Sequence, residues 1–178
     1  MNSKLSHSIG AVYFSHGKES GPWGDKIKRL AQVAEAKGFV VYSIDYSGIA
    51  DPDLRVQKLL ASHAPEPGHL IVVGSSMGGY VATVASETLK PQGLFLMAPA
   101  LYLPGFSNQD PVPQAGLTAI VHGWKDELIP VEHSIRFAEK YGAQLHLVDG
   151  DHRLISQIPF ITSVFSSFLD QVSLGEYP

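Results

Sequence analysis

The sequence predicts an α/β protein, in which about six mainly parallel strands form one sheet that is covered by helices on both faces. Short apolar, β-branched runs alternate along the chain with longer segments whose apolar residues recur at helical spacing. The runs are apolar at nearly every position, which is typical of strands buried on both sides. No internal repeat, low-complexity tract or linker divides the chain, so one domain over residues 1–178 is expected.

The expected strands are the apolar runs that end at turn-forming or polar residues. They cover residues 9–14, 39–44, 69–73, 93–98, 117–121 and 144–148.

Five helices are expected between and after these strands. The first begins at Pro22 and ends at Gly38, because proline is favoured at a helix start and glycine at its end. The second begins at Asp51-Pro52. The third, residues 77–89, is almost wholly apolar and is expected in the middle of the molecule. Apolar residues at helical spacing mark the helices: Ile27, Leu30, Ala31 and Ala34 in the first, Leu54, Leu59 and Leu60 in the second, Val81, Val84, Ala85 and Leu89 in the third, Val131, Ile135 and Ala138 before a cap at Gly142 in the fourth, and Ile158, Ile161, Phe165 and Phe168 in the fifth.

Composition excludes several classes of protein. The chain has no cysteine, so it forms no disulfide or thiolate metal site. Its formal net charge of -4, without a basic cluster, argues against a nucleic-acid partner. The most apolar stretch, residues 93–106, is interrupted by Pro99 and Pro104 and is too short to cross a bilayer. The first residues lack the apolar core of a secretory signal, so a cytoplasmic location is expected, with frayed ends at about residues 1–8 and 171–178.

The most informative stretch is residues 74–78, G-S-S-M-G, where an apolar strand meets an apolar helix. G-x-S-x-G in this position is the pattern of a nucleophile elbow, a sharp turn that exposes the central serine above the sheet. Gly74 and Gly78 flank Ser76 at the two positions where a Cβ would meet neighbouring backbone. Ser75 has no glycine at the same two distances.

Two phosphate-binding motifs are also glycine-rich turns between a strand and a helix. A dinucleotide fingerprint that starts at Gly74 requires glycine at position 76 and an acidic residue about 20 positions later, and neither is present. A phosphate-binding loop requires lysine after Gly79, where Tyr80 stands. A tight turn that contains serine by chance stays open on the motif alone.

Polar residues that follow the strands are the candidates for chemistry, because ligands of an open parallel sheet bind beyond the carboxyl ends of its strands. Ser76, Asp126 and His152 each follow a different expected strand. A serine hydroxyl becomes a nucleophile when an imidazole accepts its proton, and the imidazole needs a carboxylate that holds its tautomer and stabilises its cation. The chain order serine, acid, histidine is the one expected of this architecture.

Other residues compete for these roles. Glu127 is a neighbouring alternative to Asp126 as the acid, and Asp110 is a remote one. His16 precedes the serine and is expected to brace the loop that follows the first strand. No compact metal-ligand motif is formed by the histidines near strand ends and their neighbouring aspartates, so no metal or other cofactor is expected at His16, His122 or His152.

At these residues the sequence resembles the small serine α/β-hydrolases and is similar to the minimal, lidless bacterial esterases. The resemblance spans residues 9–169 and implies a minimal three-layer α/β-hydrolase fold, with Ser76 as nucleophile, Asp126 as acid and His152 as base. Many relatives carry a helical cap after the fourth strand, and the connection 99–116 is too short for a large one. The resemblance rests on His16-Gly17, on G-S-S-M-G at 74–78, on H-G-x-x-D-x-x-I-P at 122–130 and on Gly150-Asp151-His152.

The resemblance also implies an oxyanion hole made of the backbone N–H groups of Met77 and Lys18. Some relatives have a glycine-rich loop at the second position, where this chain has K-E-S-G, and the Lys18 side chain there can meet an acidic part of a substrate. Leu101, Tyr102 and Phe106 are candidates for an apolar wall around an acyl or alcohol group, with ordinary core and loop packing as the alternative.

The expected function is therefore a serine hydrolase, carboxylesterase-like (EC 3.1.1) or a thioesterase. It would cleave a small or medium acyl ester or thioester, a small-molecule substrate, through an acyl-Ser76 intermediate. The alternative is a non-catalytic binding or scaffolding protein on the same fold, because a fold alone does not establish a function. A metal-dependent hydrolase is a weaker third hypothesis.

Overall fold

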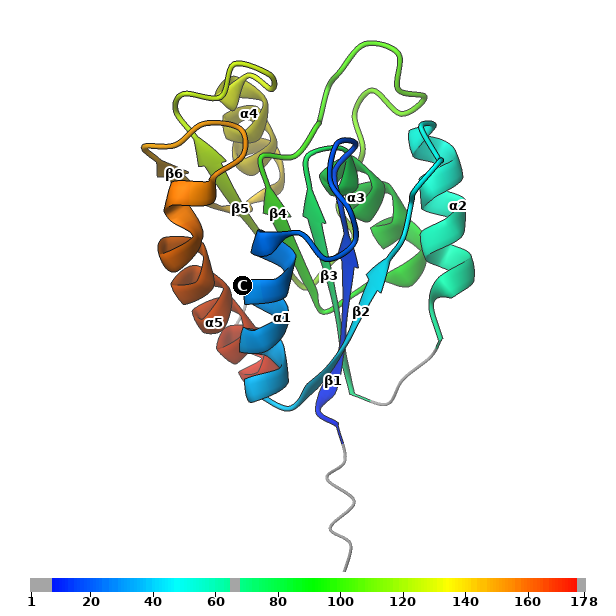
Figure 1. The fold of residues 1–178 in the computed structure, drawn as a ribbon, viewed down its shortest axis with the longest axis vertical. Coiled ribbons are helices and arrows are strands. Elements are labelled where there is room, and N and C mark those ends of the chain that lie inside the picture. The colour runs from blue at the N-terminus through cyan, green and yellow to red at the C-terminus, as the bar shows by residue number, and fades with distance from the viewer. Residues whose placement is uncertain (1–7, 65–67, 176–178) are drawn as a thin grey trace, which may run out of the picture.

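The computed structural model describes residues 8–64 and 68–175, in which six parallel strands form one sheet (Figure 1). The strands are β1 (Gly10–Ser15), β2 (Phe39–Ile44), β3 (His69–Ser75), β4 (Gly93–Met97), β5 (Leu117–Gly123) and β6 (Gln144–Val148). Their spatial order is β2-β1-β3-β4-β5-β6, so the direction of chain progress reverses between β1 and β3. The predicted α/β class, with about six parallel strands, is confirmed.

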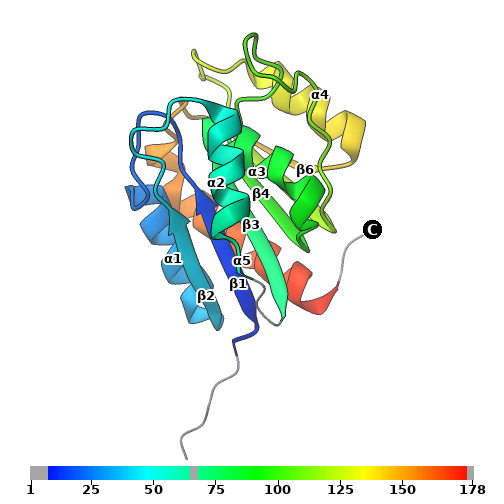
Figure 2. The ribbon, with the colours of Figure 1, turned by 90° about the vertical axis from the view of Figure 1, so that its right-hand side faces the viewer.

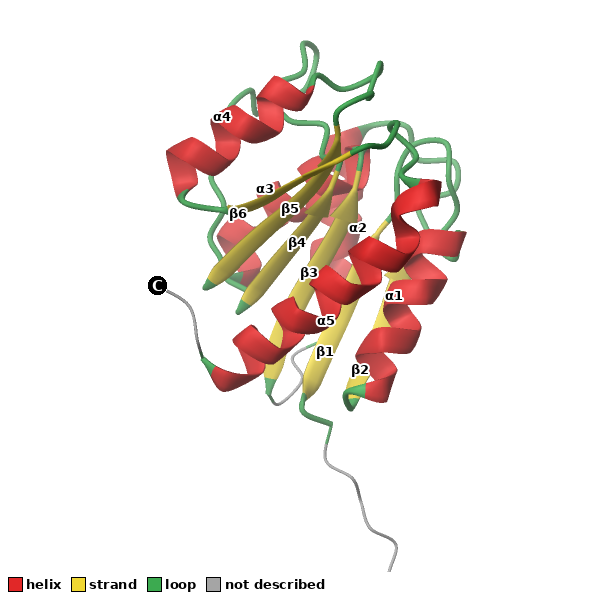
Figure 3. Ribbon diagram, turned by 90° about the vertical axis from the view of Figure 1, so that its left-hand side faces the viewer, coloured by secondary structure: helices red, strands yellow, loops and turns green. Residues whose placement is uncertain are grey.

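Helices cover both faces of the sheet, as predicted (Figure 2, Figure 3). One face carries α1 (Asp25–Ala36) and α5 (Ile158–Leu174), and the other carries α2 (Pro52–Ser62), α3 (Met77–Leu89) and α4 (Val131–Tyr141). A short 3-10 turn, Ile155–Gln157, precedes α5. In β1, Val12 and Phe14 join the core under α1 and α5, whereas Ala11 and Tyr13 join the core under α2 and α3. This alternation explains why the strands are apolar at nearly every position.

An aromatic contact fixes α5 on the sheet. Phe95 of β4 meets Phe165 and Phe168 edge-on, with ring centroids 5.0 and 5.3 Å apart. All three side chains are buried, and burial of one such side chain stabilises a fold by about 1.5–3 kcal/mol. Because the 149–157 loop leads directly into α5, a firmly seated α5 also fixes the end of that loop.

Local signals place most element ends where the sequence predicts them. The bounds of β2, β6 and α3 agree with the prediction, and the other strands differ by one or two residues. Asp51 caps α2 by accepting the N–H groups of Asp53 and Leu54, at 2.8 and 3.2 Å. Gly142 ends α4 in the left-handed conformation, with φ of 67°.

One helix prediction needs correction. The first helix begins at Asp25 rather than Pro22, because the Pro22 carbonyl accepts the Ser43 hydroxyl and ties this segment to β2. Leu54 of α2 and Ile135 of α4, which mark these helices by their spacing, are 52% and 36% exposed. Each lies at the edge of its helix, and the inward face of that helix includes a buried polar residue that forms hydrogen bonds. This residue is Arg55 in α2 and Ser134 in α4.

The predicted frayed end at 171–178 also needs correction, because α5 continues to Leu174. The remaining parts of the predicted frayed ends, residues 1–7 and 176–178, lie outside the described residues. The connection 98–116, which is described throughout, contains no helix or strand, and no large cap covers the sheet. Among the helices of the described ranges, none has both the length and the apolar character needed to cross a membrane.

Candidate active site at the carboxyl ends of the strands

Ser76 lies between the last residue of β3 and the first of α3, in a strained turn. Its φ of 55° and ψ of -122° place a non-glycine residue in a costly region of backbone space, and such strain of about 1–3 kcal/mol is typical of functional sites. Glycine is required on both sides. A Cβ on Gly78 would lie 1.9 Å from the Ser15 carbonyl oxygen, and one on Gly74 would lie 2.3 Å from the Gly78 carbonyl oxygen. The G-x-S-x-G spacing is therefore a packing requirement.

Backbone hydrogen bonds hold this turn against the neighbouring strand. The Ser76 N–H donates to the Met97 carbonyl at 3.0 Å, and the Ser76 carbonyl accepts the Ala100 N–H at 2.9 Å. The turn also lies beside β1, at the point where the strand order reverses. Reversal points of this kind are where open α/β sheets bind ligands.

The three residues predicted to form a triad lie in one chain of hydrogen bonds. The Ser76 Oγ lies 2.9 Å from His152 Nε2, and His152 Nδ1 lies 2.7 Å from Asp126 Oδ2. Their side chains come from the loops after β3, β5 and β6. The Asp126 side chain is wholly buried, whereas that of His152 is 16% exposed.

Close backbone contact brings the β5 and β6 loops together. The Trp124 N–H donates to the Val148 carbonyl at 2.9 Å, and the Lys125 N–H donates to the Gly150 carbonyl at 3.0 Å. A Cβ on Gly123 would lie 2.1 Å from that same Gly150 oxygen, so only glycine permits this approach. The loop that carries Asp126 is therefore pinned to the loop that carries His152.

The carboxylate of Asp126 is held on every side. Oδ1 accepts the N–H groups of Leu128 and Ile129, at 2.9 and 2.8 Å, while Oδ2 faces His152. Burial alone would raise the pKa of Asp126, but the hydrogen bonds from Ile129, His152 and Leu128 outweigh it and leave the pKa below its ordinary value. This carboxylate is therefore ionised at neutral pH. The alternative acids lie elsewhere: Glu127 is exposed, and Asp110 binds Lys140 of α4.

Two further residues touch this arrangement that sequence reasoning did not place there. His122 Nε2 lies 2.9 Å from Asp126 Oδ2. The Lys26 ammonium of α1 donates to Ser75 Oγ at 3.2 Å, next to the turn. The only sequence signal for His122 is its place in H-G-x-x-D, and Lys26 resembles any lysine of an amphipathic helix.

The loop after β1 lies against the turn. A Cβ on Gly17 would lie 3.4 Å from the Ser76 Cβ. His16 braces this loop, because its Nδ1 donates to the Gly17 carbonyl at 2.8 Å and its Nε2 accepts the Tyr46 N–H at 3.0 Å. Burial lowers the pKa of His16, which favours this neutral form. Arg55, itself buried, donates to the Gly17 carbonyl at 3.2 Å.

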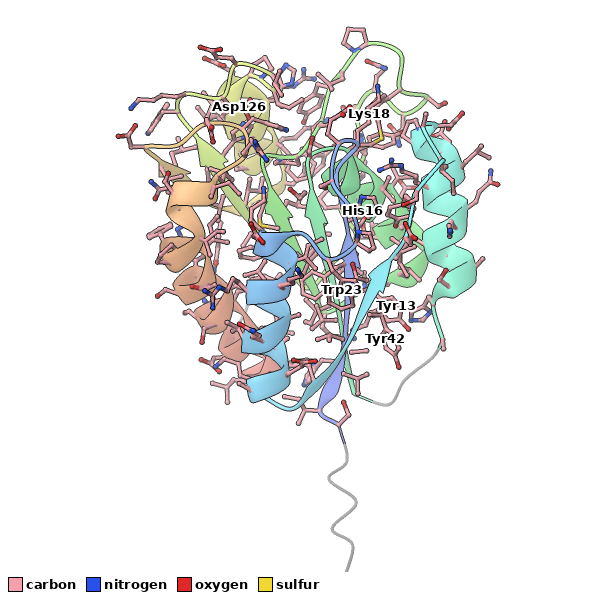
Figure 4. All side chains as sticks on the ribbon, viewed as in Figure 1. Tyr13, His16, Lys18, Trp23, Tyr42 and Asp126 are labelled. Atoms are coloured by element: carbon pink, nitrogen blue, oxygen red, sulfur yellow. The ribbon has the colours of Figure 1, made fainter. Side chains whose placement is uncertain are left out.

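Of the two predicted oxyanion donors, Met77 follows Ser76 in the chain, and Lys18 follows Gly17, which lies against Ser76. Met77 is the first residue of α3, so its N–H has no acceptor within the helix. Lys18 follows Gly17 and is exposed. Figure 4 shows Lys18 and Asp126 at the end of the molecule toward which the strands run, with Tyr13 and Tyr42 farther down the sheet.

The predicted substrate wall is placed differently from the triad residues. Leu101 is wholly buried in the core under α2, α3 and α4, so it offers no surface to a substrate. The Tyr102 ring lies under the Arg136 guanidinium, 4.0 Å from its carbon, and Phe106 packs on Tyr80 with ring centroids 4.6 Å apart. For Leu101 the alternative of ordinary core packing therefore holds. The ring contacts hold Tyr102 beside α4 and Phe106 beside α3.

Two other features bear on ligands. Within residues 8–64 and 68–175, no group of three or more histidine, aspartate or glutamate side chains is arranged to hold a metal ion. A surface groove of about 490 Å³ lies between α1 and the start of α5, lined by Asp25, Lys28, Arg29, Gln32, Ile158 and Pro159. None of its lining residues belongs to the candidate triad, so we do not connect the groove with the chemistry of Ser76.

Comparison with known proteins places these features in a family. The sequence pattern of the alpha/beta hydrolase family matches residues 12–166. A proposed hydrolase of the alpha/beta superfamily from Xanthomonas campestris pv. campestris is 34% identical, with a TM-score of 0.82, and the match covers 92% of this chain and 99% of that one. No curated protein sequence matches the chain.

More distant structures share the fold. Est1E from Butyrivibrio proteoclasticus, which has also been solved with ferulic acid bound, is 15% identical over 95% of this chain and 90% of its own, with a TM-score of 0.76. A serine hydrolase without a lid, from Xanthomonas campestris, is 18% identical over 96% of this chain and 85% of its own, with a TM-score of 0.69.

Proposed function

The chain belongs to the alpha/beta hydrolase family, and from this premise we propose that it is a serine hydrolase that cleaves an acyl ester or thioester. The fold and its hydrolase relatives support hydrolysis in general. The single observation that supports a serine mechanism is the continuous chain of hydrogen bonds from Ser76 Oγ through His152 to Asp126, at 2.9 and 2.7 Å. Distances of this size are those over which a proton is transferred.

In the proposed reaction, His152 Nε2 takes the proton of the Ser76 hydroxyl as Oγ attacks the acyl carbon. Asp126 stabilises the imidazolium that forms, and its low pKa keeps it charged while it does so. The imidazolium then gives its proton to the leaving alcohol or thiol, and an acyl-Ser76 ester remains. A water molecule, deprotonated by His152, attacks that ester and releases the acid, which restores the Ser76 hydroxyl.

The negative oxygen of each tetrahedral intermediate needs donors that are already in place. The N–H of Met77, at the amino end of α3, is the first candidate, and the helix dipole adds to its effect. The loop 17–18, held against Ser76 by His16 and Arg55, supplies the second candidate, the Lys18 N–H. The removal of one such donor typically costs about 100-fold or more in rate.

Small and medium acyl esters, carboxylesterase-like substrates of the EC 3.1.1 class, and thioesters are the substrates we propose to test first, because the connection 98–116 forms no large cap over the site. Tyr102 and Phe106, but not Leu101, remain candidates for substrate contact. Since one structural relative binds ferulic acid, aryl esters belong in the same panel. A single domain over residues 1–178 and a cytoplasmic location remain predictions.

A fluorophosphonate tests the proposal, because it reacts with activated serines only. We expect intact-mass analysis to show one adduct on the wild type and on Ser75→Ala, and none on Ser76→Ala. Ser75→Ala is the matched control, since it removes the neighbouring hydroxyl. If a folded wild type forms no adduct, the proposal is rejected in favour of a non-catalytic binding protein. If Ser75→Ala abolishes the adduct, the assignment of the nucleophile to Ser76 is wrong.

A further inference from the structure

A second histidine shares the acid of the candidate triad. His122, near the end of β5, brings its Nε2 to 2.9 Å from Asp126 Oδ2, the same oxygen that His152 Nδ1 approaches to 2.7 Å. The side chains of His122 and Asp126 are both wholly buried. A serine, histidine and aspartate relay does not by itself require this residue.

The partners of His122 determine which of its nitrogens carries the proton. Nε2 faces two acceptors, the Asp126 carboxylate at 2.9 Å and the Ile129 carbonyl at 3.2 Å. Nε2 must therefore be protonated. Nδ1 lies 2.7 Å from the hydroxyl of Ser134, a buried residue of α4 that can donate to it. Burial lowers the pKa of His122 and outweighs the attraction of Asp126, so the ring is neutral and donates from Nε2 only.

This assignment gives the Asp126 carboxylate four donors. Two backbone N–H groups bind Oδ1, and two imidazole N–H groups bind Oδ2. The backbone donors come from the 128–129 turn, and His122 comes from the rigid sheet. The carboxylate is thus prevented from rotating, and part of its charge is neutralised by a donor other than His152.

We propose that His122 is a positioning residue for the candidate triad: its Nε2–H fixes the orientation of Asp126 and limits the basicity of His152. The inference rests on the proposed serine hydrolase function. Without the His122 donor, the full charge of a buried carboxylate faces His152, which favours the imidazolium. His152 then holds its proton to higher pH and is less often the free base that Ser76 requires.

Two variants test whether His122 acts as a hydrogen-bond donor to Asp126 or only as a ring that fills space. Gln in place of His122 carries its amide nitrogen to about the position of Nε2, so His122→Gln keeps a donor for Asp126. Asn reaches only to about the position of Nδ1, so His122→Asn keeps a partner for Ser134 and loses that donor. Lys26 of α1 interacts electrostatically with Asp126 and with Asp151 and Arg153, the two neighbours of His152 in its loop, and both variants leave these charges unchanged.

The experiment titrates His152 by NMR and measures the rate of fluorophosphonate labelling across pH. In His122→Asn we expect the NMR titration of His152 to move to higher pH than in the wild type, with the midpoint of the labelling profile moving the same way. We also expect labelling at high pH to slow about tenfold or more, because small misplacements of a relay are costly. His122→Gln should stay close to the wild type in both measurements.

A folded His122→Asn with an unchanged His152 titration would overturn the proposal, as would equal effects of both variants, which indicate packing alone. If His122→Asn does not fold, the nitrogen chemical shifts of His122 in the wild type decide. They must show a protonated Nε2 and a bare Nδ1, and the opposite tautomer refutes the inference. Because the NMR titration needs no turnover, it distinguishes a failure of this inference from a failure of the hydrolase proposal.

Discussion

Lys26 occupies an unfavourable place for a cation, and its replacement by methionine tests that reasoning. It lies in the first turn of α1, where the helix dipole opposes a positive charge. Its ammonium donates to Ser75 Oγ, and no carboxylate among the described residues pairs with it within 4.0 Å. Burial lowers the pKa of Lys26 from 10.5 to about 8, although Asp151 pulls it upward. The charged form is therefore destabilised in the folded protein.

The pKa shift sets the size and sign of the effect. The unfolded chain keeps a pKa of 10.5 and the folded protein has one of about 8, so the unfolded state binds more protons between these values. Stability due to Lys26 therefore rises as pH increases from about 8 to about 10.5, by at most about 3 kcal/mol at 1.36 kcal/mol per unit. Because the side chain is partly exposed, we expect about 1–2 kcal/mol.

The assay is urea unfolding of the wild type and Lys26→Met at pH 7, 8.5 and 10. We expect the variant to be more stable than the wild type at pH 7 by about 1–2 kcal/mol. This advantage should vanish by pH 10, because Lys26 is then neutral in the folded wild type and the variant has only lost a hydrogen bond. Lys28→Met, at an exposed position of the same helix, controls for the added methionine. A Lys26→Met variant that is less stable at pH 7, or whose difference from the wild type does not change with pH, would refute the reasoning.

Two packing predictions follow from the same structure. Gly78→Ala would place a Cβ 1.9 Å from the Ser15 carbonyl, so we expect a loss of at least about 3 kcal/mol by thermal unfolding, whereas Gly21→Ala, with no atom within 4 Å of its new Cβ, should be nearly neutral. Phe165→Ala should cost about 3–5 kcal/mol in urea unfolding, against less than about 1 kcal/mol for Phe160→Ala, which is 42% exposed. Equal losses within either pair would contradict the packing described.

Much of the fold is predictable because its signals are local. Continuous apolar runs indicate strands buried on both faces, and Asp51-Pro52 and Gly142 mark helix ends through their own backbone preferences. Leu54 marks the second helix by its spacing, yet its side chain is 52% exposed. Helical spacing identifies a face but not its edge, and the inward position of α2 is taken by Arg55, whose bond to the Gly17 carbonyl joins residues far apart in sequence.

In the candidate site, too, some residues are predictable from local signals, whereas others depend on contacts between distant parts of the chain. Ser76, Asp126 and His152 were predicted from a motif, a chain order and the rule that strand ends meet at one edge of a sheet, and the structure brings their side chains within hydrogen-bonding distance. His122 was not predicted as a partner of Asp126, because its role depends on Ser134 of a helix that packs against the sheet only after folding. The position of Lys26 beside Ser75 likewise depends on how α1 is seated.

The connection 98–116 also bears on how such a protein can diversify. Its first residues are anchored, since the Ala100 N–H binds the Ser76 carbonyl, and its last residues are anchored, since the Gly116 N–H binds the Pro91 carbonyl at 3.1 Å. Between these anchors, residues 103–110 are exposed or half-buried and carry no helix or strand. Extra segments inserted there would leave the turn at Ser76 in place. Evolution or engineering can thus add a substrate-selecting cap at this loop while the α/β-hydrolase fold beneath it stays unchanged.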